Sequence, residues 1–532
     1  MKKLSHIHNS VVSVGFITLL MILACAPARA ELINQGRPNV ILIVVDDLGY
    51  ADFGASPHTP ADVEGLGTPA IDKLANSGTL LTEAYATSPI CSPSRAGLIT
   101  GRYQQRWGNY WYGEGGLPKD QATLAQNLQP LGYDTIKIGK THLNGGPAQH
   151  PLDHGYDRFF GFIHHTWDYT RLSQKDLDAY LSRVDGKKGR LGILCVGPLM
   201  RDRTFASIDQ PDAFTTELFT DEAIDFIEKE RGVRPYFVHL SYNAMHMPTY
   251  VCDPDYAERL GVEQQPWDRE ADRWEFPFWE PNEISWRDWH KKWGHLGEVD
   301  PHGRKRYLSH LLALDDNIGR LLQSIEASGE KDNTIVVLVS DNGGTINTYS
   351  NNTPLNGWKF MFGEGGLRIP MIIAAPGRLP QGQELRGVTS AMDVVPTILE
   401  LVGSPTDQPL DGRSLVAKLN EGSHQDMHEY LCWANGRGPK VIRKGQWKLA
   451  IDCHWQHSVF EIDELGIARP SVTNYEYPGG QVLFDLIDDI GETKDLAGQR
   501  PKIVAELLND FKAWRSEMSD PRTSDGVVKK KK

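Results

Sequence analysis

Residues Asn39–Val45 read NVILIVV, and the run ends in two carboxylates, Asp46 and Asp47. An unbroken apolar run rich in β-branched residues is typical of a strand buried on both faces of a sheet. A helix is predicted next, at residues 68–75, where a threonine and a proline suit the N-cap and the first helical position. A buried strand followed by a helix is the repeating unit of a parallel sheet that helices cover.

The same alternation continues along the chain. Apolar runs predict further strands, and periodic patterns predict helices between them. Because parallel strands are joined by crossovers that are usually helical, the pattern indicates an α/β fold, with a large mainly parallel or mixed sheet sandwiched by helices. The predicted strands are residues 134–138, 236–240 and 334–339, and the predicted helices are residues 123–131, 216–231 and 305–328.

The pattern changes after residue 403. Short strands followed by one last helix indicate a small C-terminal α+β subdomain. We predict strands within residues 441–451 and 481–486, a helix at 503–517, and two units, a main domain at 31–403 and the subdomain at 404–532.

A loop-rich insertion interrupts the main domain at about residues 251–303. It is rich in tryptophan. An indole can stack on the face of a sugar ring, or it can pack the insertion onto the body of the protein, and both interpretations stay open. The tryptophans are Trp267, Trp274, Trp279, Trp286, Trp289 and Trp293.

The composition of the chain limits its function. The 532 residues carry a formal net charge of −13, with 40% hydrophobic and 23% charged residues. These fractions are ordinary for a soluble globular protein. The negative charge argues against nucleic-acid binding, which needs clustered lysine and arginine. An anionic substrate would therefore need a local basic pocket on an acidic body.

Residues 1–30 predict a secretory signal peptide. Two lysines precede an apolar stretch, and the sequence ARA before residue 31 is typical of a cleavage site. The apolar stretch is short for a membrane-spanning helix. We predict cleavage after Ala30 and a periplasmic or secreted mature protein without a membrane span. A lipid anchor on Cys25 is the alternative.

The cysteines bear on the predicted compartment. In an oxidising environment four of the six cysteines are available for disulfides, apart from Cys25 and Cys91. We predict nearest-neighbour pairing, with four free buried thiols as the alternative. The predicted pairs are Cys195 with Cys252 and Cys432 with Cys453.

Oxygen ligands follow two of the predicted strands. Asp46 and Asp47 end the first, and Asp341 and Asn342 follow the strand at 334–339. The carboxyl ends of parallel strands meet at one edge of a sheet, where α/β folds bind ligands. Either pair alone would more often be a turn or a helix cap. Together they predict a site for a hard cation, Ca²⁺ or Mg²⁺.

Lysine and histidine side chains fall at the same predicted edge. Lys140 and His142 follow the strand at 134–138, and His246 follows the strand at 236–240. An ammonium group can hold an anionic oxygen, and an imidazole can move a proton near neutral pH. Lys359 precedes a tight turn farther along the chain. Each of these residues alone would be assigned a structural or surface role.

Residues 88–102 read SPICSPSRAGLITGR. Pro93 opens a turn after Cys91, and Arg95 lies one helical turn beyond the sulfur if a helix starts there. That arrangement suits an anion. A small apolar core cysteine is the alternative.

Six motifs, VDD, CSPSR, GKxH, HxP, SDNG and KxxxxEGGxRxP, occur in this order between Asn39 and Pro370. The series resembles the type I sulfatases of the alkaline-phosphatase-like superfamily, in which the motif cysteine becomes formylglycine (3-oxoalanine). This chain departs from the family at Thr141 and Asn144, where members often have tryptophan and glycine. These changes concern substrate contacts more than the chemistry.

The resemblance implies a set of site residues. One calcium ion would be held by Asp46, Asp47, Asp341, Asn342 and Cys91 as formylglycine. The catalytic residues would be Cys91, Arg95, Lys140, His142, His246, Asp341 and Lys359. A formylglycine-generating maturation enzyme is the implied protein partner.

The resemblance also implies a mechanism. A hydroxyl of hydrated formylglycine, with Asp341 as the base, attacks sulfur, and His246 with Lys359 protonates the leaving oxygen. His142 then deprotonates the second hydroxyl, which expels sulfate. A cysteine has no second hydroxyl, so the chemistry needs the modification.

The expected substrate is a sulfated carbohydrate, either a polysaccharide or its oligosaccharides. A sulfated algal galactan such as carrageenan is one expectation, and a glycosaminoglycan is equally defensible. Trp107, Tyr110 and Trp111, close after the cysteine motif, are expected at the substrate rim. The alternatives are a phosphonate or phosphate ester hydrolase of the same superfamily and a non-catalytic carbohydrate-binding homologue.

Overall fold

The structure is a computed structural model that describes residues 36–111, 114–143, 149–163, 199–206, 214–230, 234–247, 249, 252–262, 302–404, 406, 408–436, 438–452, 456–462, 468–474 and 480–522. Several sequence-based predictions lie outside these residues: the signal segment, most of the tryptophan-rich insertion with its six tryptophans, Asn144, Cys25, Cys195 and Cys453.

The described residues form an eleven-stranded mixed sheet, ordered β10-β2-β9-β8-β1-β7-β3-β4-β5-β6, with β11 beside β2. Its centre is parallel, since β1 pairs in parallel with β7 and β8, and β3 with β7 and β4. β9 runs antiparallel between β8 and β2. The predicted fold class is confirmed. The strands are β1 (Asn39–Val45), β2 (Thr79–Tyr85), β3 (Asp134–Lys140), β4 (Arg158–Phe162), β5 (Met200–Arg201), β6 (Thr204–Phe205), β7 (Tyr236–Ser241), β8 (Thr334–Ser340), β9 (Arg368–Ala374), β10 (Gln383–Leu385) and β11 (Thr389–Ser390).

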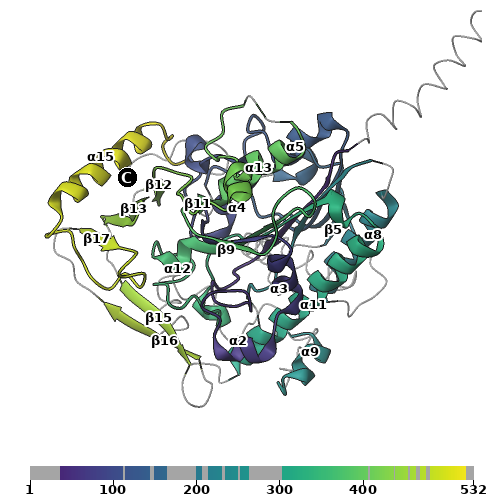
Figure 1. Cartoon of the computed structure of the whole chain (residues 1–532), viewed down its shortest axis with the longest axis horizontal. Coiled ribbons are helices and arrows are strands. Elements are labelled where there is room, and N and C mark those ends of the chain that lie inside the picture. The colour runs from purple at the N-terminus through teal and green to yellow at the C-terminus, as the bar shows by residue number, and fades with distance from the viewer. Residues whose placement is uncertain are drawn as a thin grey trace, which may run out of the picture.

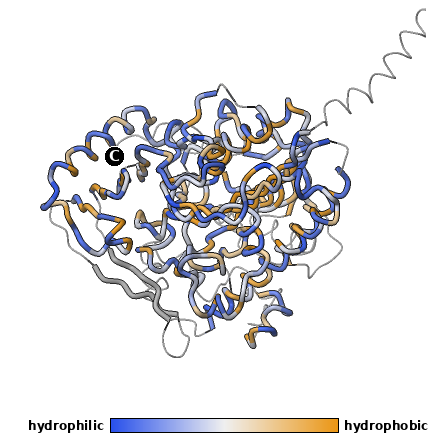
Figure 2. The backbone as a smooth tube through the Cα atoms, in the orientation of Figure 1, coloured by the Kyte–Doolittle hydropathy of each residue, from blue (hydrophilic) through white to orange (hydrophobic). Residues whose placement is uncertain are grey.

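Alternate residues of β1 feed two separate cores. Ile41, Ile43 and Val45 pack in the cluster under α3 (Pro69–Asn76), α8 (Thr215–Glu230) and α11 (Gly303–Ala327). Val40, Leu42 and Val44 pack under α4 (Cys91–Thr100), α5 (Leu124–Leu128) and α13 (Val394–Leu401). Side chains of a strand point alternately to opposite faces, which explains why the whole run is apolar. Helices therefore cover both faces of the sheet (Figure 1). The hydrophobic residues are concentrated along the central strands (Figure 2).

The helices are α2 (Ala61–Leu66), α3 (Pro69–Asn76), α4 (Cys91–Thr100), α5 (Leu124–Leu128), α8 (Thr215–Glu230), α9 (Pro254–Arg259), α11 (Gly303–Ala327), α12 (Glu364–Leu367), α13 (Val394–Leu401), α14 (Val416–Glu421) and α15 (Pro501–Ser516). Short 3₁₀ helices span Gln104–Trp107, Gln129–Leu131, Pro151–Asp153, Lys331–Asn333, Ile346–Thr348 and Ala391–Asp393.

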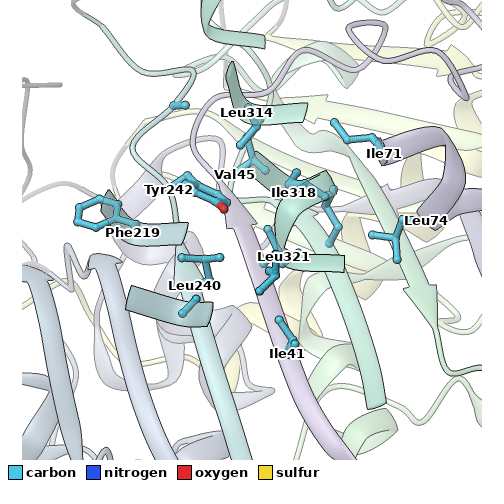
Figure 3. Packing of buried hydrophobic residues seen from close by; sticks show 14 of the residues in the cluster. Ile41, Val45, Ile71, Leu74, Phe219, Leu240, Tyr242, Leu314, Ile318 and Leu321 are labelled. Carbon is cyan, nitrogen blue, oxygen red and sulfur yellow. The ribbon is translucent and has the colours of Figure 1, made fainter. Parts of the chain in front are cut away.

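The long helix α11 shows how the pattern sets the packing. Leu311, Leu314, Ile318, Leu321 and Ile325 recur at spacings of three and four residues, so they share one face of the helix, and all five are buried. Leu314, Ile318 and Leu321 lie against the side chains of β1 and α3 in Figure 3. Burying each such side chain stabilises the fold by about 1.5–3 kcal/mol.

The C-terminal body is a four-stranded antiparallel sheet, β12-β13-β14-β17, among the described residues. The predicted strand region 441–451 falls on two strands, joined by a turn at Gly445 with φ of +54°. The strands are β12 (Leu431–Ala434), β13 (Lys440–Lys444), β14 (Trp447–Ile451) and β17 (Gln481–Asp485), and a separate hairpin pairs β15 (Gln456–Ile462) with β16 (Ala468–Asn474).

The two sheets share a buried contact region. Trp433 of β12 donates its indole hydrogen to the carbonyl of Ala86, 2.8 Å away, and its ring lies 5.5 Å from that of Tyr85. Leu507, Phe511 and Trp514 of α15 pack in the same cluster, and α15 lies near β12 and β13 in Figure 1. The segment that precedes Cys91 is therefore held in place by the C-terminal sheet.

None of the described helices is long and apolar enough to cross a membrane.

Candidate active site

The predicted site residues of three parallel strands meet at one edge of the large sheet. Val45, the last residue of β1, is in register with Ser340, the last of β8, so Asp46 and Asp341 leave neighbouring strands side by side. Lys140 is the last residue of β3, whose neighbour β7 runs in parallel with it and leads toward His246. This is the edge at which α/β sheets bind ligands.

The centre of the site is acidic. Carboxylate oxygens of Asp46, Asp47 and Asp341 all lie within 4.8 Å of one another, and the three residues are buried. The backbone N–H of Asp47 donates to Asp341 Oδ1 at 3.3 Å. The φ of Asp47 is +59°, a left-handed conformation that aspartate tolerates better than most residues and that turns the chain directly after the strand.

Asn342 adds a further oxygen to this group. Its Nδ2 donates to Asp47 Oδ1 at 2.7 Å and to the carbonyl of Gly343 at 2.9 Å. Its buried Oδ1 accepts no hydrogen bond among the described residues. A buried polar atom without a partner is costly unless a ligand satisfies it. Three carboxylates and an amide oxygen together are a donor set that fits a hard divalent cation.

Three buried cations contact these carboxylates. Arg95 Nε lies 2.8 Å from Asp341 Oδ2, Lys140 forms an ion pair with Asp46, and Lys359 Nζ lies 2.7 Å and 2.8 Å from the two oxygens of Asp47. Three positive charges thus balance three negative ones. A divalent cation bound here would leave the pocket positively charged, which is the local basic site that an anionic substrate needs on this acidic protein.

The cations and burial shift the pKa values of the acids in opposite directions. Burial would raise the pKa of Asp46, but the charges of Lys140 and Arg95 outweigh it and hold that pKa well below its usual range. For Asp341, burial and the neighbouring Asp46 prevail over Arg95 and raise the pKa to about 7. A carboxyl group poised near neutrality is suited to exchanging a proton.

Cys91 is the first residue of α4, a helix whose ten residues are all buried. Its Sγ lies within 4.8 Å of both a carboxylate oxygen of Asp46 and a ring nitrogen of His246. Burial raises the pKa of the thiol to about 11, although Lys140 and Lys359 act in the opposite direction. The thiolate, which is the nucleophilic form, is therefore scarce at neutral pH. An unmodified Cys91 is a poor nucleophile in this position.

Two histidines border the centre in their neutral forms. His246 Nδ1 lies 2.8 Å from the carbonyl of Met247, and a carbonyl only accepts, so Nδ1 carries the proton. Its Nε2 lies 3.8 Å from Asp47 Oδ2. Burial, reinforced by Lys359 and Lys140, lowers the pKa of His246 to about 3. Burial and Lys140 also lower the pKa of His142 well below its ordinary value.

A second set of contacts holds the loops that carry the acids. Asn352 Oδ1 accepts from the backbone of Tyr50 at 3.2 Å and of Gly344 at 3.1 Å, which ties the loop after β1 to the loop after β8. Arg304 at the start of α11 lies 2.8 Å from Asp52 and 2.7 Å from Asp62. Sequence reasoning missed these contacts because the residues carry no motif and because the partners are far apart in the chain, 252 residues for Arg304 with Asp52 and 302 for Tyr50 with Asn352.

The three aromatic residues expected at the substrate rim differ in placement. Trp107 and Tyr110 are 5% and 1% exposed, and they donate to the carbonyls of Gly116 and Ser519, each at 2.8 Å. Both side chains therefore pack inside the protein and do not lie at an exposed rim. Trp111 is half-buried and stacks on Phe362 with an interplanar angle of 13°.

The profile of the sulfatase family matches residues 38–404. The chain belongs to the sulfatase family. The match spans the large sheet and all the motif residues described above.

Individual sulfatases are similar to this chain over most of its length. Human arylsulfatase D is 28% identical in an alignment that covers 90% of this chain and 85% of the relative. The N-acetylgalactosamine-6-sulfatase of Canis lupus familiaris is 28% identical in an alignment that covers 81% of this chain and 74% of the relative. The crystal structure of Ps i-CgsB in complex with k-i-k-neocarrahexaose superimposes with a TM-score of 0.71 at 26% identity and covers 91% of this chain and 94% of that one.

Proposed function

We propose that this sulfatase removes sulfate from a sulfated saccharide, with Cys91 matured to formylglycine and one calcium ion bound at the acidic centre. The observation that carries the proposal is the assembly of Asp46, Asp47, Asp341 and Cys91 with a complete set of buried cations at one sheet edge. The same arrangement supports catalysis rather than simple binding, because a non-catalytic homologue needs neither the buried nucleophile position nor the balanced charges.

The proposed calcium ligands are the oxygens of Asp46, Asp47, Asp341 and Asn342, with the modified Cys91 side chain as the fifth. The Asn342 oxygen that lacks a partner among the described residues supports this assignment, as does the all-oxygen chemistry of the protein ligands. A cation bound here supplies Lewis acidity to the nucleophile and to the sulfate oxygens. Matured Cys91 supplies a nucleophile with two hydroxyl groups on one carbon.

The basic residues of the site form two groups, one beside Asp46 and Asp341 and the other beside Asp47. Arg95 and Lys140 contact Asp46, and Arg95 also contacts Asp341. We assign to this side the binding of the sulfate oxygens and the lowering of negative charge at the nucleophile. We assign to Asp341, which lies beside Asp46 and contacts Arg95, the role of the base that accepts the proton of the attacking hydroxyl.

Lys359 and His246 both approach Asp47, on the other side of the site. We assign them to the leaving oxygen of the sugar. In the tautomer fixed by Met247, His246 Nε2 carries no proton, so the ammonium of Lys359 is the group that holds one in the resting enzyme. We assign to His142, which is neutral and buried, the role of accepting the proton whose loss expels sulfate.

A saccharide substrate is supported by the similarity to Ps i-CgsB, whose structure holds a neocarrahexaose, with a carrageenan or another sulfated galactan as the first candidate. The similarity to arylsulfatase D and to the N-acetylgalactosamine-6-sulfatase does not identify the sugar that this enzyme desulfates. We also propose that residues 1–30 direct export, and that a maturation enzyme meets the chain before Cys91 is buried in α4.

The test is release of inorganic sulfate from carrageenan, fucoidan, ulvan and chondroitin oligosaccharides, with conversion of Cys91 verified by peptide mass. Release from one of these that disappears in Cys91→Ala and persists in the matched thiol variant Cys252→Ala would support the proposal. If fully converted protein releases no sulfate from any of these saccharides but hydrolyses a phosphate or phosphonate ester, the proposal is overturned.

A further inference from the structure

Phe360 lies directly beside a proposed catalytic group. The Nζ of Lys359 is 5.7 Å from the centroid of the Phe360 ring, within the range of a cation–π contact. Lys359 is 3% exposed, whereas Phe360 is half-buried. Phe360 is therefore a partly exposed ring next to the buried ammonium.

A second half-buried ring continues this surface. The Trp111 ring centroid lies 6.5 Å from that of Phe360, and Trp111 stacks on the buried Phe362 at 6.3 Å. Phe362 is 5% exposed. We call Phe360 and Trp111, with Phe362 beneath them, the aromatic wall. Its members come from segments about 250 residues apart in the chain.

The backbone of Phe360 is held in a conformation that its side chain does not favour. Its φ is +75°, in the left-handed region that a bulky residue rarely adopts. Its N–H donates to the carbonyl of Pro89 at 2.8 Å, and the N–H of Lys359 donates to Gly344 at 3.0 Å. A glycine would take this φ without strain. The phenylalanine instead places a ring beside Lys359, while its backbone is tied to the segment that enters α4.

We propose that the aromatic wall is the subsite that binds the sugar ring carrying the sulfate ester. This inference rests on the proposed saccharide substrate. The C–H face of a pyranose ring is apolar and packs on aromatic faces, while its hydroxyls stay available for hydrogen bonds. A sugar stacked on Phe360 presents its ester oxygen toward Lys359, on the side already assigned to the leaving group. Phe360 and Trp111 then determine specificity, and the buried charges perform the chemistry.

The test uses Phe360→Gly, which removes the ring and relieves the backbone, Phe360→Tyr, which keeps the ring, and Trp111→Ala. We expect KM for the saccharide that the wild-type enzyme desulfates to rise about tenfold in Phe360→Gly and in Trp111→Ala, and to stay within about twofold of wild type in Phe360→Tyr. The inhibition constant of inorganic sulfate, which needs the charged pocket alone, should be unchanged in all three. Tyr256→Ala on α9 is the control for loss of a half-buried ring elsewhere.

Two outcomes overturn the inference in different ways. An unchanged KM in Phe360→Gly, with normal saccharide turnover by the wild-type enzyme, contradicts the aromatic wall alone. If converted wild-type protein desulfates no saccharide but hydrolyses an aryl sulfate, the proposed substrate class fails and the inference fails with it. A parallel rise in KM and in the sulfate inhibition constant would show that the variants disturb the charged pocket, which also contradicts a stacking role.

Discussion

Lys448 of β14 and Glu364 of α12 form an ion pair of 2.9 Å in which both side chains are fully buried. Lys448 also lies 2.7 Å from Glu492, which is buried as well. The pair joins the C-terminal sheet to the segment that carries Lys359 into β9. We therefore expect the stability of the C-terminal sheet to depend on this buried ammonium group.

We expect Lys448→Met to destabilise the protein by about 3–5 kcal/mol, because it removes the nearest cation from two buried carboxylates. Glu364 keeps longer ion-pair contacts with Arg368 and Arg443, at 3.8 Å and 3.7 Å. Lys73→Met is the matched control. Lys73 pairs with Glu326 at 3.1 Å, but both side chains are at least half exposed, so its loss should change stability by about 1 kcal/mol or less. Equal melting temperatures for the two variants would contradict this expectation.

Glu492 should make stability depend on pH. Burial and the nearby Glu364 raise its pKa to about 7, against Lys448, from an ordinary value of 4.5. Between these values the folded state binds more protons than the unfolded state, so stability falls as pH rises from about 4.5 to 7, by roughly 1–3 kcal/mol. Glu492→Gln keeps the shape and removes the titration. Urea midpoints at pH 5 and pH 8 should differ less in this variant than in the wild-type protein; an equal or larger difference would assign the pH dependence to other groups.

The sequence predicted the parts of the fold that depend on short-range pattern. The run Asn39–Val45 is buried at every position, and the strands expected at 134–138, 236–240 and 334–339 correspond to β3, β7 and β8. The rule that ligands bind at the carboxyl ends of parallel strands then brought Asp46 and Asp341 together correctly, because register follows from the parallel pairing.

What the sequence did not predict depends on long-range contacts and backbone strain. Arg304 and Asp52 meet across about 250 residues, and nothing in either neighbourhood marks the pair. Phe360 reads as an ordinary apolar residue until its positive φ and its contact with Lys359 are known. The placement of Trp107 and Tyr110 likewise required the fold, since an aromatic residue near a motif packs inward or outward with the same local sequence.

Arg304 offers a test of the contacts that hold the acidic loops. It is 3% exposed, pairs with Asp52 and Asp62, and donates to the carbonyl of Tyr349 at 2.8 Å. We expect Arg304→Met to lower stability by about 3–5 kcal/mol, since Asp52 is left buried without its partner.

At a temperature where the variant is folded, we also expect kcat for sulfate release to fall while KM changes less, because the loops that place the catalytic groups loosen. Arg320→Met, in the same helix, breaks an exposed pair with Asp221 and should leave both quantities within experimental scatter. A normal kcat in folded Arg304→Met would limit this residue to a structural role.

The amide oxygen of Asn342 offers the sharpest test of the metal site. In Asn342→Leu the shape is similar but the oxygen is gone, so calcium should bind more weakly. A ligand that binds only the folded state stabilises it in proportion to the logarithm of its concentration over Kd, so each tenfold loss of affinity removes about 1.4 kcal/mol of calcium-dependent stabilisation. The measurement is the difference in melting temperature between calcium and chelator, which cancels the basal effect of losing the hydrogen bonds to Asp47 and Gly343.

Asn317→Leu is the matched control for Asn342→Leu. It removes a buried amide that donates to Ala313 at 2.8 Å in α11, away from the acidic centre, so basal stability should fall while the calcium-dependent shift stays at the wild-type value. A full calcium shift in Asn342→Leu would remove this residue from the ligand set. A wild-type protein whose melting temperature is the same in calcium and in chelator would overturn the assignment of calcium to the site, because three buried carboxylates that bind the ion must transmit its binding energy to the fold.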